Sequence, residues 1–129
     1  MPQDNPYGLG QKDLDQYYRQ KAINILEKIT KSCFRMFRDK TTTKEQLIDR
    51  FFVLKEKLDA LWVVYLDAEY HMEMRKHIEK LENTLQADFD LEKIREVQMT
   101  QLNRLQKLKN KTNYKKDKYR KRSSWLDIQ

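Results

Sequence analysis

Apolar side chains recur every three or four residues along residues 44–86, a stretch without Gly or Pro. This heptad spacing continues for the whole stretch, with one change of phase after Met72. The pattern predicts a single helix of about 43 residues, roughly 65 Å long at 1.5 Å per residue. We expect this long helix to be the central element of the fold.

The apolar face of this predicted helix becomes much wider between residues 51 and 66 than a two-position seam requires. A helix that is apolar over so much of its circumference needs covering from at least two sides. We therefore predict that this part contacts partner proteins. The predicted interface consists of Phe51, Phe52, Leu54, Leu58, Leu61, Trp62, Tyr65 and Leu66.

An earlier helix is expected from about Asp13 to about Arg38, because two apolar stripes run side by side along it. The link at residues 39–43 contains two possible capping boxes, Thr42 with Glu45 and Thr43 with Gln46. A connection of about five residues places two long helices antiparallel and adjacent. The expected core is thus a helical hairpin.

Residues 86–90 leave two alternatives open. Asp88 or Asp90 could cap a new helix that folds back, or the long helix could continue as a rod. The segment from Leu91 to about Asn110 has a weak apolar seam interrupted by Gln98 and Gln101, which favours a coiled-coil arm over a core helix.

Composition agrees with an all-α chain of one domain. Both prolines and both glycines lie within the first ten residues, and the rest is rich in helix formers. The predicted fold class is an antiparallel helical hairpin with a long central helix, a coiled-coil arm or third helix, and a flexible basic tail. The predicted divisions are a disordered segment 1–12, a helical domain 13–110 and a tail 111–129.

The formal charge of +7 is concentrated near the end of the chain. Residues 104–122 contain ten Lys or Arg against one acid, Asp117, whereas the remainder has 17 basic and 19 acidic residues. Such clusters suit a nuclear import signal or contact with nucleic acid. The alternative is a solvated, disordered end that only aids solubility. The candidate residues are Lys115, Lys116, Lys118, Arg120, Lys121 and Arg122.

Three large apolar side chains follow this charged segment, namely Trp125, Leu126 and Ile128. Leaving them exposed is unfavourable. They either dock back on the helical hairpin or insert into a partner as a short linear motif, a role in which Trp is a frequent anchor.

Signs of catalytic or metal chemistry are weak. Glu69, Glu73 and His77 share one helical face, but no second Glu-x-x-His unit completes a metal site, so neither metal nor cofactor is predicted. The chain has no Gly-rich phosphate loop and no recognisable nucleophile and base, which predicts that it is not an enzyme. We expect the single cysteine, Cys33, to be a small buried apolar residue.

The chain opens without a signal-peptide pattern, and its longest apolar run, residues 61–66, is far shorter than the roughly 20 residues needed to span a bilayer. We therefore expect an intracellular protein without membrane or small-molecule partners.

The run Phe34-Arg35-Met36-Phe37-Arg38, a short polar turn, and a helix with Leu54, Leu58, Leu61 and Tyr65 resemble the small helical subunits of the Mediator transcription complex, of the subunit 30 type. The resemblance covers about residues 20–72, and the segment after Met72 departs from it by being short and by ending in the basic tail. It implies a nuclear, non-enzymatic scaffold subunit without a ligand site.

Together these features predict a non-enzymatic helical scaffold or adaptor subunit of a larger intracellular complex, in the nucleus more than in the cytoplasm and related to transcription. Its partners would be other helical subunits, in a hetero-complex more than a homodimer. The alternative is a nucleic-acid-binding protein that acts through its basic tail.

Overall fold

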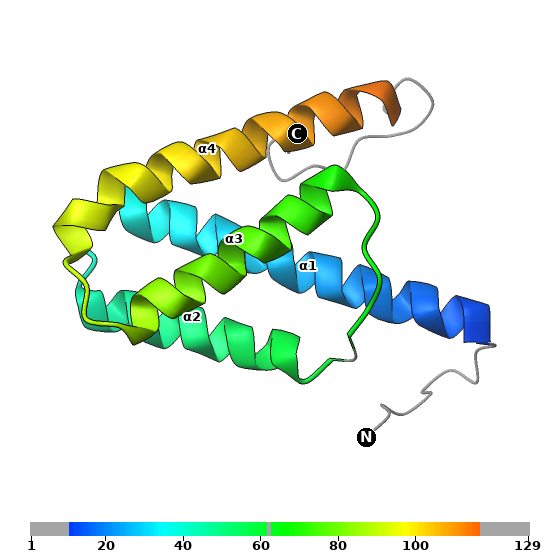
Figure 1. Ribbon diagram of the computed structural model, residues 1–129, viewed down its shortest axis with the longest axis horizontal. Helices are drawn as coiled ribbons and strands as arrows, with labels where there is room; N and C mark the ends of the chain where they lie inside the picture. Colours follow the sequence, from blue (N-terminus) through cyan, green and yellow to red (C-terminus); the bar gives the residue numbers. More distant parts are fainter. Residues whose placement is uncertain (1–10, 62, 117–129) are drawn as a thin grey trace.

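The computed structural model describes residues 11–61 and 63–116, and these form four helices without any strand. They are α1 (Gln11–Arg38), α2 (Lys44–Asp59), α3 (Glu69–Gln86) and α4 (Leu91–Lys116). Consecutive helices run in roughly opposite directions, with two tight turns at one end of the molecule and a longer loop at the other (Figure 1). The all-α prediction is therefore confirmed for the described residues.

The first helix, α1, is the centre of the bundle. It packs against α2, α3 and α4, while α3 also packs against α4. In Figure 1, α2 and α4 lie on either side of α1, and α3 crosses in front of it. The two apolar stripes predicted along α1 supply these contacts, and Leu26, Ile29 and Phe37 are almost completely buried.

The prediction of one long central helix over residues 44–86 is wrong. Helix α2 ends at Asp59, residues 60–68 form a loop, and α3 begins at Glu69. The break falls in the continuous apolar run 61–66. In a helix those six side chains would point in all directions, and about half would face water. Val63 and Val64 are also β-branched, which lowers helix propensity.

The lengths of the helices give a second reason for the break. With 28 residues, α1 is about 42 Å long, so it could not cover a straight helix of roughly 65 Å. Folding back at the loop brings α3 against α1 instead. The buried face of α3 consists of Tyr70, Met74, His77, Ile78, Leu81 and Leu85. The change of seam phase after Met72 therefore belongs to a second helix.

The turn between α1 and α2 has the predicted capping chemistry, and it selects one of the two predicted boxes. The Thr43 hydroxyl accepts a hydrogen bond of 3.1 Å from the Gln46 amide, and the Thr43 amide donates to Gln46 Oε1 at 2.9 Å. Two otherwise unpaired amides at the start of α2 are thus satisfied. Thr43 is the cap, and Thr42 precedes it.

At residues 86–90 the chain turns, which decides between the two alternatives left open by the sequence. Asp90 Oδ1 accepts a hydrogen bond from the Glu92 amide at 3.0 Å, so Asp90 caps α4. Helix α4 then runs back along α1 and α3, and it buries Leu102 and Leu105 in the common core. It extends to Lys116, beyond the expected end near Asn110.

Candidate functional site

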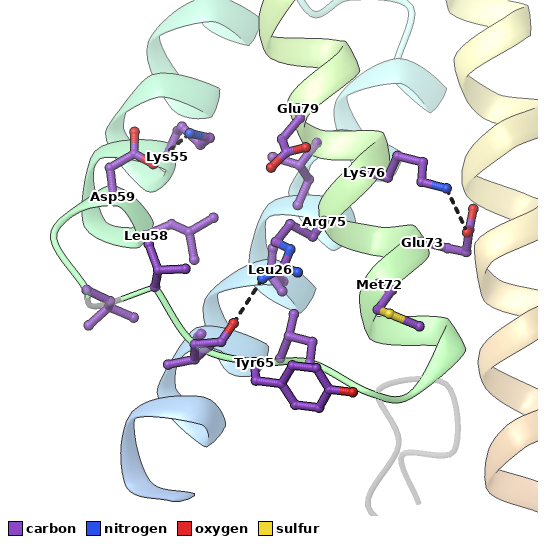
Figure 2. Close-up of a pocket in the computed structure, with 16 residues that line it drawn as sticks. Leu26, Lys55, Leu58, Asp59, Tyr65, Met72, Glu73, Arg75, Lys76 and Glu79 are labelled. Atoms are coloured by element: carbon purple, nitrogen blue, oxygen red, sulfur yellow. Dashed lines mark hydrogen bonds and ion pairs between the residues drawn. The ribbon is translucent and has the colours of Figure 1, made fainter. Parts of the chain in front are cut away.

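A cleft of about 900 Å³ lies between α2 and α3. Its floor includes Ala22 and Leu26 from α1, and the loop between α2 and α3 forms one end. Figure 2 shows Leu58 and Leu26 inside the cleft and Tyr65 at its edge. The cleft exists because α2 and α3 pack against α1 more closely than against each other.

Large apolar side chains around this cleft are open to solvent. Val63 is 97% exposed, Tyr65 is 72% exposed and Met72 is 40% exposed. By contrast, Leu66, from the same loop, is buried. An exposed apolar group that lines a concave surface is characteristic of a site that binds another molecule.

Polar contacts hold the walls of the cleft in place. Arg75 Nη1 donates a hydrogen bond of 3.1 Å to the Val64 carbonyl oxygen, which ties the loop to α3 (Figure 2). Lys76 pairs with Glu73 at 3.2 Å on the rim. The loop is therefore anchored at its backbone, although Val63 and Tyr65 on either side of Val64 point their side chains into solvent.

A buried lysine bridges the two helices that form the cleft walls. Lys55 Nζ lies 2.7 Å from Asp59 Oδ1 in α2 and 3.3 Å from Glu82 Oε1 in α3. Burial lowers the pKa of Lys55, but the hydrogen bonds and charges of Asp59 and Glu82 outweigh it and raise the pKa above its usual value. Lys55 therefore stays charged and links α2 to α3.

The predicted interface residues fall into three groups. Phe51, Leu54 and Leu66 belong to the protein's own core, so in this fold they offer no surface to a partner. Phe52, Leu58 and Leu61 are half-buried, and Tyr65 is exposed. Trp62 lies outside the described residues. The cleft collects four of the predicted residues, namely Leu58, Leu61, Tyr65 and Leu66.

Sequence reasoning missed the cleft residues Met72 and Arg75 of α3, and within the predicted interface stretch 51–66 it did not select Lys55, Val63 or Val64. The signal that could have identified them is the loss of helical periodicity in the run 61–66. The run 61–66 has apolar residues at every position, and neither a 3.6-residue nor a two-residue period fits it. A loop with exposed apolar groups is consistent with such a run.

The predicted basic and C-terminal residues are mostly beyond the described part of the chain. Lys115 and Lys116 lie in the last turn of α4. Lys118, Arg120, Lys121 and Arg122 lie outside the described residues, as do the apolar residues Trp125, Leu126 and Ile128. Their predicted roles in import, nucleic-acid binding or docking stay predictions.

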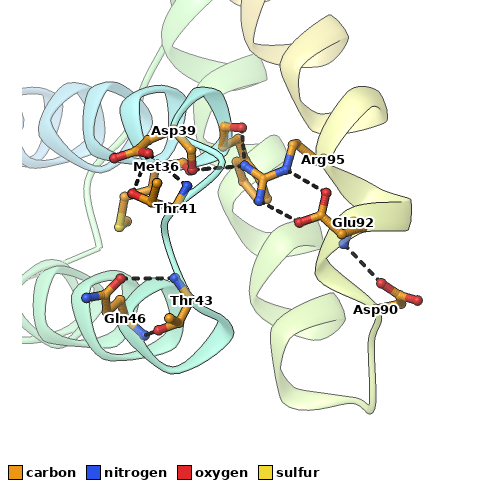
Figure 3. Close-up of polar contacts among 9 residues, drawn as sticks. Met36, Asp39, Thr41, Thr43, Gln46, Asp90, Glu92 and Arg95 are labelled. Carbon is orange, nitrogen blue, oxygen red and sulfur yellow. Dashed lines mark hydrogen bonds and ion pairs between the residues drawn. The ribbon is translucent and has the colours of Figure 1, made fainter.

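A polar cluster at the end with the tight turns is centred on Arg95 of α4, whose side chain is buried (Figure 3). Its guanidinium donates to the carbonyl oxygens of Phe37, at 2.5 Å, and Asp39, at 3.1 Å. It also pairs with Glu92 at 2.9 Å. The cation satisfies carbonyls at the C-terminal end of α1, where a positive charge is favourable.

The two acids of this cluster are stabilised as carboxylates. Hydrogen bonds from the Thr41 hydroxyl and amide lower the pKa of Asp39. A hydrogen bond from Arg95 lowers the pKa of Glu92. All of these groups are engaged with one another, so the cluster joins α4 to the end of α1 and leaves little to bind a ligand.

A second polar cluster joins α1, α3 and α4 near the opposite end of the bundle. Glu27 Oε2 in α1 accepts hydrogen bonds from the Tyr70 hydroxyl in α3, at 3.0 Å, and from Lys109 in α4. The Lys109 ammonium also lies 5.7 Å from the centre of the Tyr70 ring. The buried charge of Lys109 is thereby compensated.

Glu69, Glu73 and His77 share the helical face that was weighed above as half of a metal site. They line a smaller hollow of about 360 Å³ between α3 and α4. Among residues 11–61 and 63–116, no three His, Cys, Asp or Glu side chains are placed to hold a metal ion. Burial and the charge of Lys80 lower the pKa of His77, and together they outweigh a hydrogen bond with Gln101 that acts to raise it. His77 is thus neutral near pH 7.

Cys33 is buried in the core, as predicted. Burial raises the pKa of its thiol to about 12. Because the thiolate is the reactive form of cysteine, this residue is chemically inert at neutral pH.

Comparisons with known proteins do not add an identity. No protein-family model, curated protein or solved structure is significantly similar to this chain. Among the described helices, none has a stretch that is both long and apolar enough to cross a bilayer.

Proposed function

We propose that this protein is a non-enzymatic adaptor subunit of a larger intracellular assembly, and that it binds an amphipathic helix of another subunit in the cleft between α2 and α3. The observation that carries the proposal is the exposure of Val63, Tyr65 and Met72 on a concave apolar surface. Burying such groups in a partner interface is favourable by about 25 cal/mol for each Å² of apolar surface.

The geometry of the cleft favours a helix as the occupant. Two helices form its walls and a third forms its floor, so a fourth helix laid between α2 and α3 would complete a local bundle. The contact face of the partner helix should be mostly apolar, because Lys55 and Lys76 at the cleft already pair with acids of the protein itself. Glu79 makes no ion pair with a described residue and would suit a Lys or Arg of the partner helix.

A nuclear, transcription-related assembly is the setting that we propose for this subunit. Its support is the resemblance to small Mediator subunits and the two basic clusters that suit nuclear import. The helical part of that resemblance is interrupted, because Leu54 and Leu58 lie in α2 whereas Leu61 and Tyr65 lie in the following loop. The partners would be helical subunits, in a hetero-complex.

Site-specific crosslinking in the native cells of the protein tests this proposal. A photoreactive amino acid in place of Val63 should crosslink to one defined protein, through an apolar face of a helix in that protein. The matched control is the same group in place of Val97, which is 53% exposed on α4 outside the cleft. Equal crosslinking from both positions, or none from position 63, would contradict the proposal.

A substitution at the same position measures the contribution of the cleft to partner binding. Val63→Asp should abolish capture of the crosslinked partner but change the free energy of unfolding by less than about 0.5 kcal/mol, because Val63 is almost fully exposed. Val97→Asp should leave both quantities unchanged. An unaltered partner affinity in Val63→Asp would refute cleft binding.

The alternative proposal is nucleic-acid binding through the basic tail, which is supported by the ten Lys or Arg within residues 104–122. Contacts with phosphates release counterions, so the logarithm of affinity for duplex DNA would fall with the logarithm of salt at a slope near −0.9 per phosphate. Tight binding of the purified protein to DNA at about 0.15 M salt, lost when the six candidate basic residues become Gln, would favour this alternative over import alone.

A further inference from the structure

We propose that the C-terminal cluster Trp125-Leu126-Asp127-Ile128 of this chain docks into the cleft between α2 and α3, and so covers it when no partner is bound. The inference uses the cleft of the proposed function but concerns a different occupant. It would make the tail a built-in competitor of the partner helix. Four observations support it: the position of the end of α4, the length of the chain that follows, the character of the cleft and the distribution of charge.

The second half of α4 runs beside the first turns of α3. The Lys109 ammonium faces the Tyr70 ring, and Leu108 lines the same hollow as Glu69 and Glu73. Glu73 and Met72 in turn line the cleft. Figure 1 shows the end of α4 and the start of α3 at the same end of the bundle. The chain therefore leaves the bundle close to the cleft.

The chain beyond α4 is long enough to return. From Lys109 to the end of α4 at Lys116 the helix advances about 10 Å. The eight residues 117–124 and the bond to Trp125 can span roughly 30 Å when extended. This reach covers the way back along α4 and across the first turn of α3.

The apolar character of the two surfaces matches. The cluster has three large apolar side chains, and the cleft has Val63, Tyr65 and Met72 exposed around a volume of about 900 Å³. Clefts of roughly 300–1,000 Å³ are those that enclose compact apolar ligands. Asp127, in the middle of the cluster, would meet Arg75, which lines the cleft and forms no ion pair with a described residue.

Charge favours the same path. The segment before the cluster carries Lys118, Arg120, Lys121 and Arg122. Asp67, in the loop before α3, and Glu69, the first residue of α3 and part of the hollow between α3 and α4, are both exposed, and neither forms an ion pair with a described residue. A tether of this length also gives the cluster an effective concentration of about 1 mM, so even weak docking is well populated.

Thiol labelling of the full-length chain tests the proposal. Val63→Cys places a thiol at the cleft, and the native Cys33 does not compete because it is buried with a raised pKa. In this background, changing Trp125, Leu126 and Ile128 together to Ala should increase the rate of labelling by maleimide by about tenfold, as expected if a cluster at an effective concentration of about 1 mM binds the cleft with a Kd of about 0.1 mM. The matched control, Val97→Cys on α4, should label at the same rate with either tail.

Two results would overturn the proposal. Equal labelling rates at position 63 with the native and the Ala-substituted tail would show that the cluster does not cover the cleft. Protection that increases with protein concentration would assign the occupant to a second copy of the chain. Because this measurement uses the isolated protein, it is independent of crosslinking to a partner, and either result can fail without the other.

Discussion

Lys109 in α4 pairs with Glu27 in α1, 82 residues earlier in the chain, and the lysine side chain is only 5% exposed. This contact and the hydrogen bond from Tyr70 join three helices around one carboxylate. The pair explains how a lysine of the basic C-terminal region is accommodated inside a helical bundle. It also gives a direct test of the fold.

Glu27→Gln should lower the free energy of unfolding by about 2 kcal/mol. Breaking a fully buried pair costs roughly 3–5 kcal/mol because the other charge is left without compensation, and Glu27, whose side chain is 25% exposed, should cost less. Denaturant unfolding measures the difference. The matched control is Glu73→Gln, which breaks an exposed pair with Lys76 and should cost less than about 0.5 kcal/mol.

Arg95→Lys tests the cluster that ties α4 to the end of α1. A lysine keeps the charge but cannot bond the Phe37 and Asp39 carbonyls and Glu92 at the same time. We expect the free energy of unfolding to fall by about 2–3 kcal/mol, given roughly 1.5–3 kcal/mol for a charged hydrogen bond. The exposed Arg104→Lys is the control, and an equal effect there would argue against a specific role for Arg95.

Thr43→Ala removes the cap of α2 and should cost about 1 kcal/mol. Thr42→Ala is a close control, since Thr42 is adjacent and belongs to the other capping box that the sequence offers. It should change the free energy of unfolding by less than about 0.5 kcal/mol. A larger loss from Thr42→Ala than from Thr43→Ala would show that the cap is wrongly assigned.

The pKa of His77, lowered mainly by burial, predicts a loss of stability in acid. The folded protein resists protonation of His77, whereas the unfolded chain takes up a proton near the ordinary pKa of about 6.5. The unfolded state therefore binds more protons below that pH, and this contribution to stability disappears as the pH falls through the lowered pKa of the folded state.

Thermal unfolding measured between about pH 8 and pH 5 should show this decrease in wild type. His77→Gln should flatten the pH dependence over that range, and His71→Gln should retain it. The groups around the His77 hollow, Glu69, Glu73, Lys76, Lys80 and Arg104, are unchanged in both variants. A steep decrease that persists in His77→Gln would assign the dependence to another group.

The sequence predicts those parts of the fold that depend on local signals. The 3.6-residue stripes of α1 depend on neighbouring residues and occur in the structure. Local signals also narrowed each cap to two candidates, and the structure uses one of each pair, Thr43 and Asp90. The position of Cys33 follows from the same stripes. These features require no knowledge of which helix lies opposite.

The break at residues 60–68 depends on distant contacts. Neither Gly nor Pro marks it, and Ala68 begins α3 without a side-chain cap. What favours the break is the burial of Met74, Ile78 and Leu81 against α1, which local spacing cannot reveal. For the same reason the cleft could be predicted only in part, because Val63 and Met72 become neighbours only once the chain has turned back.

The central position of α1 has a consequence for how the protein is made. A ribosome releases the N-terminus first, at about 5–20 residues per second, so α1 emerges before any of its three neighbours. Its pairing with α2 needs only the helix that follows it in the chain, but its contact with Lys109 must wait until α4 has been synthesised. The apolar sides of α1 that receive α3 and α4 are therefore uncovered in the nascent chain, where a chaperone or a partner subunit can reach them first.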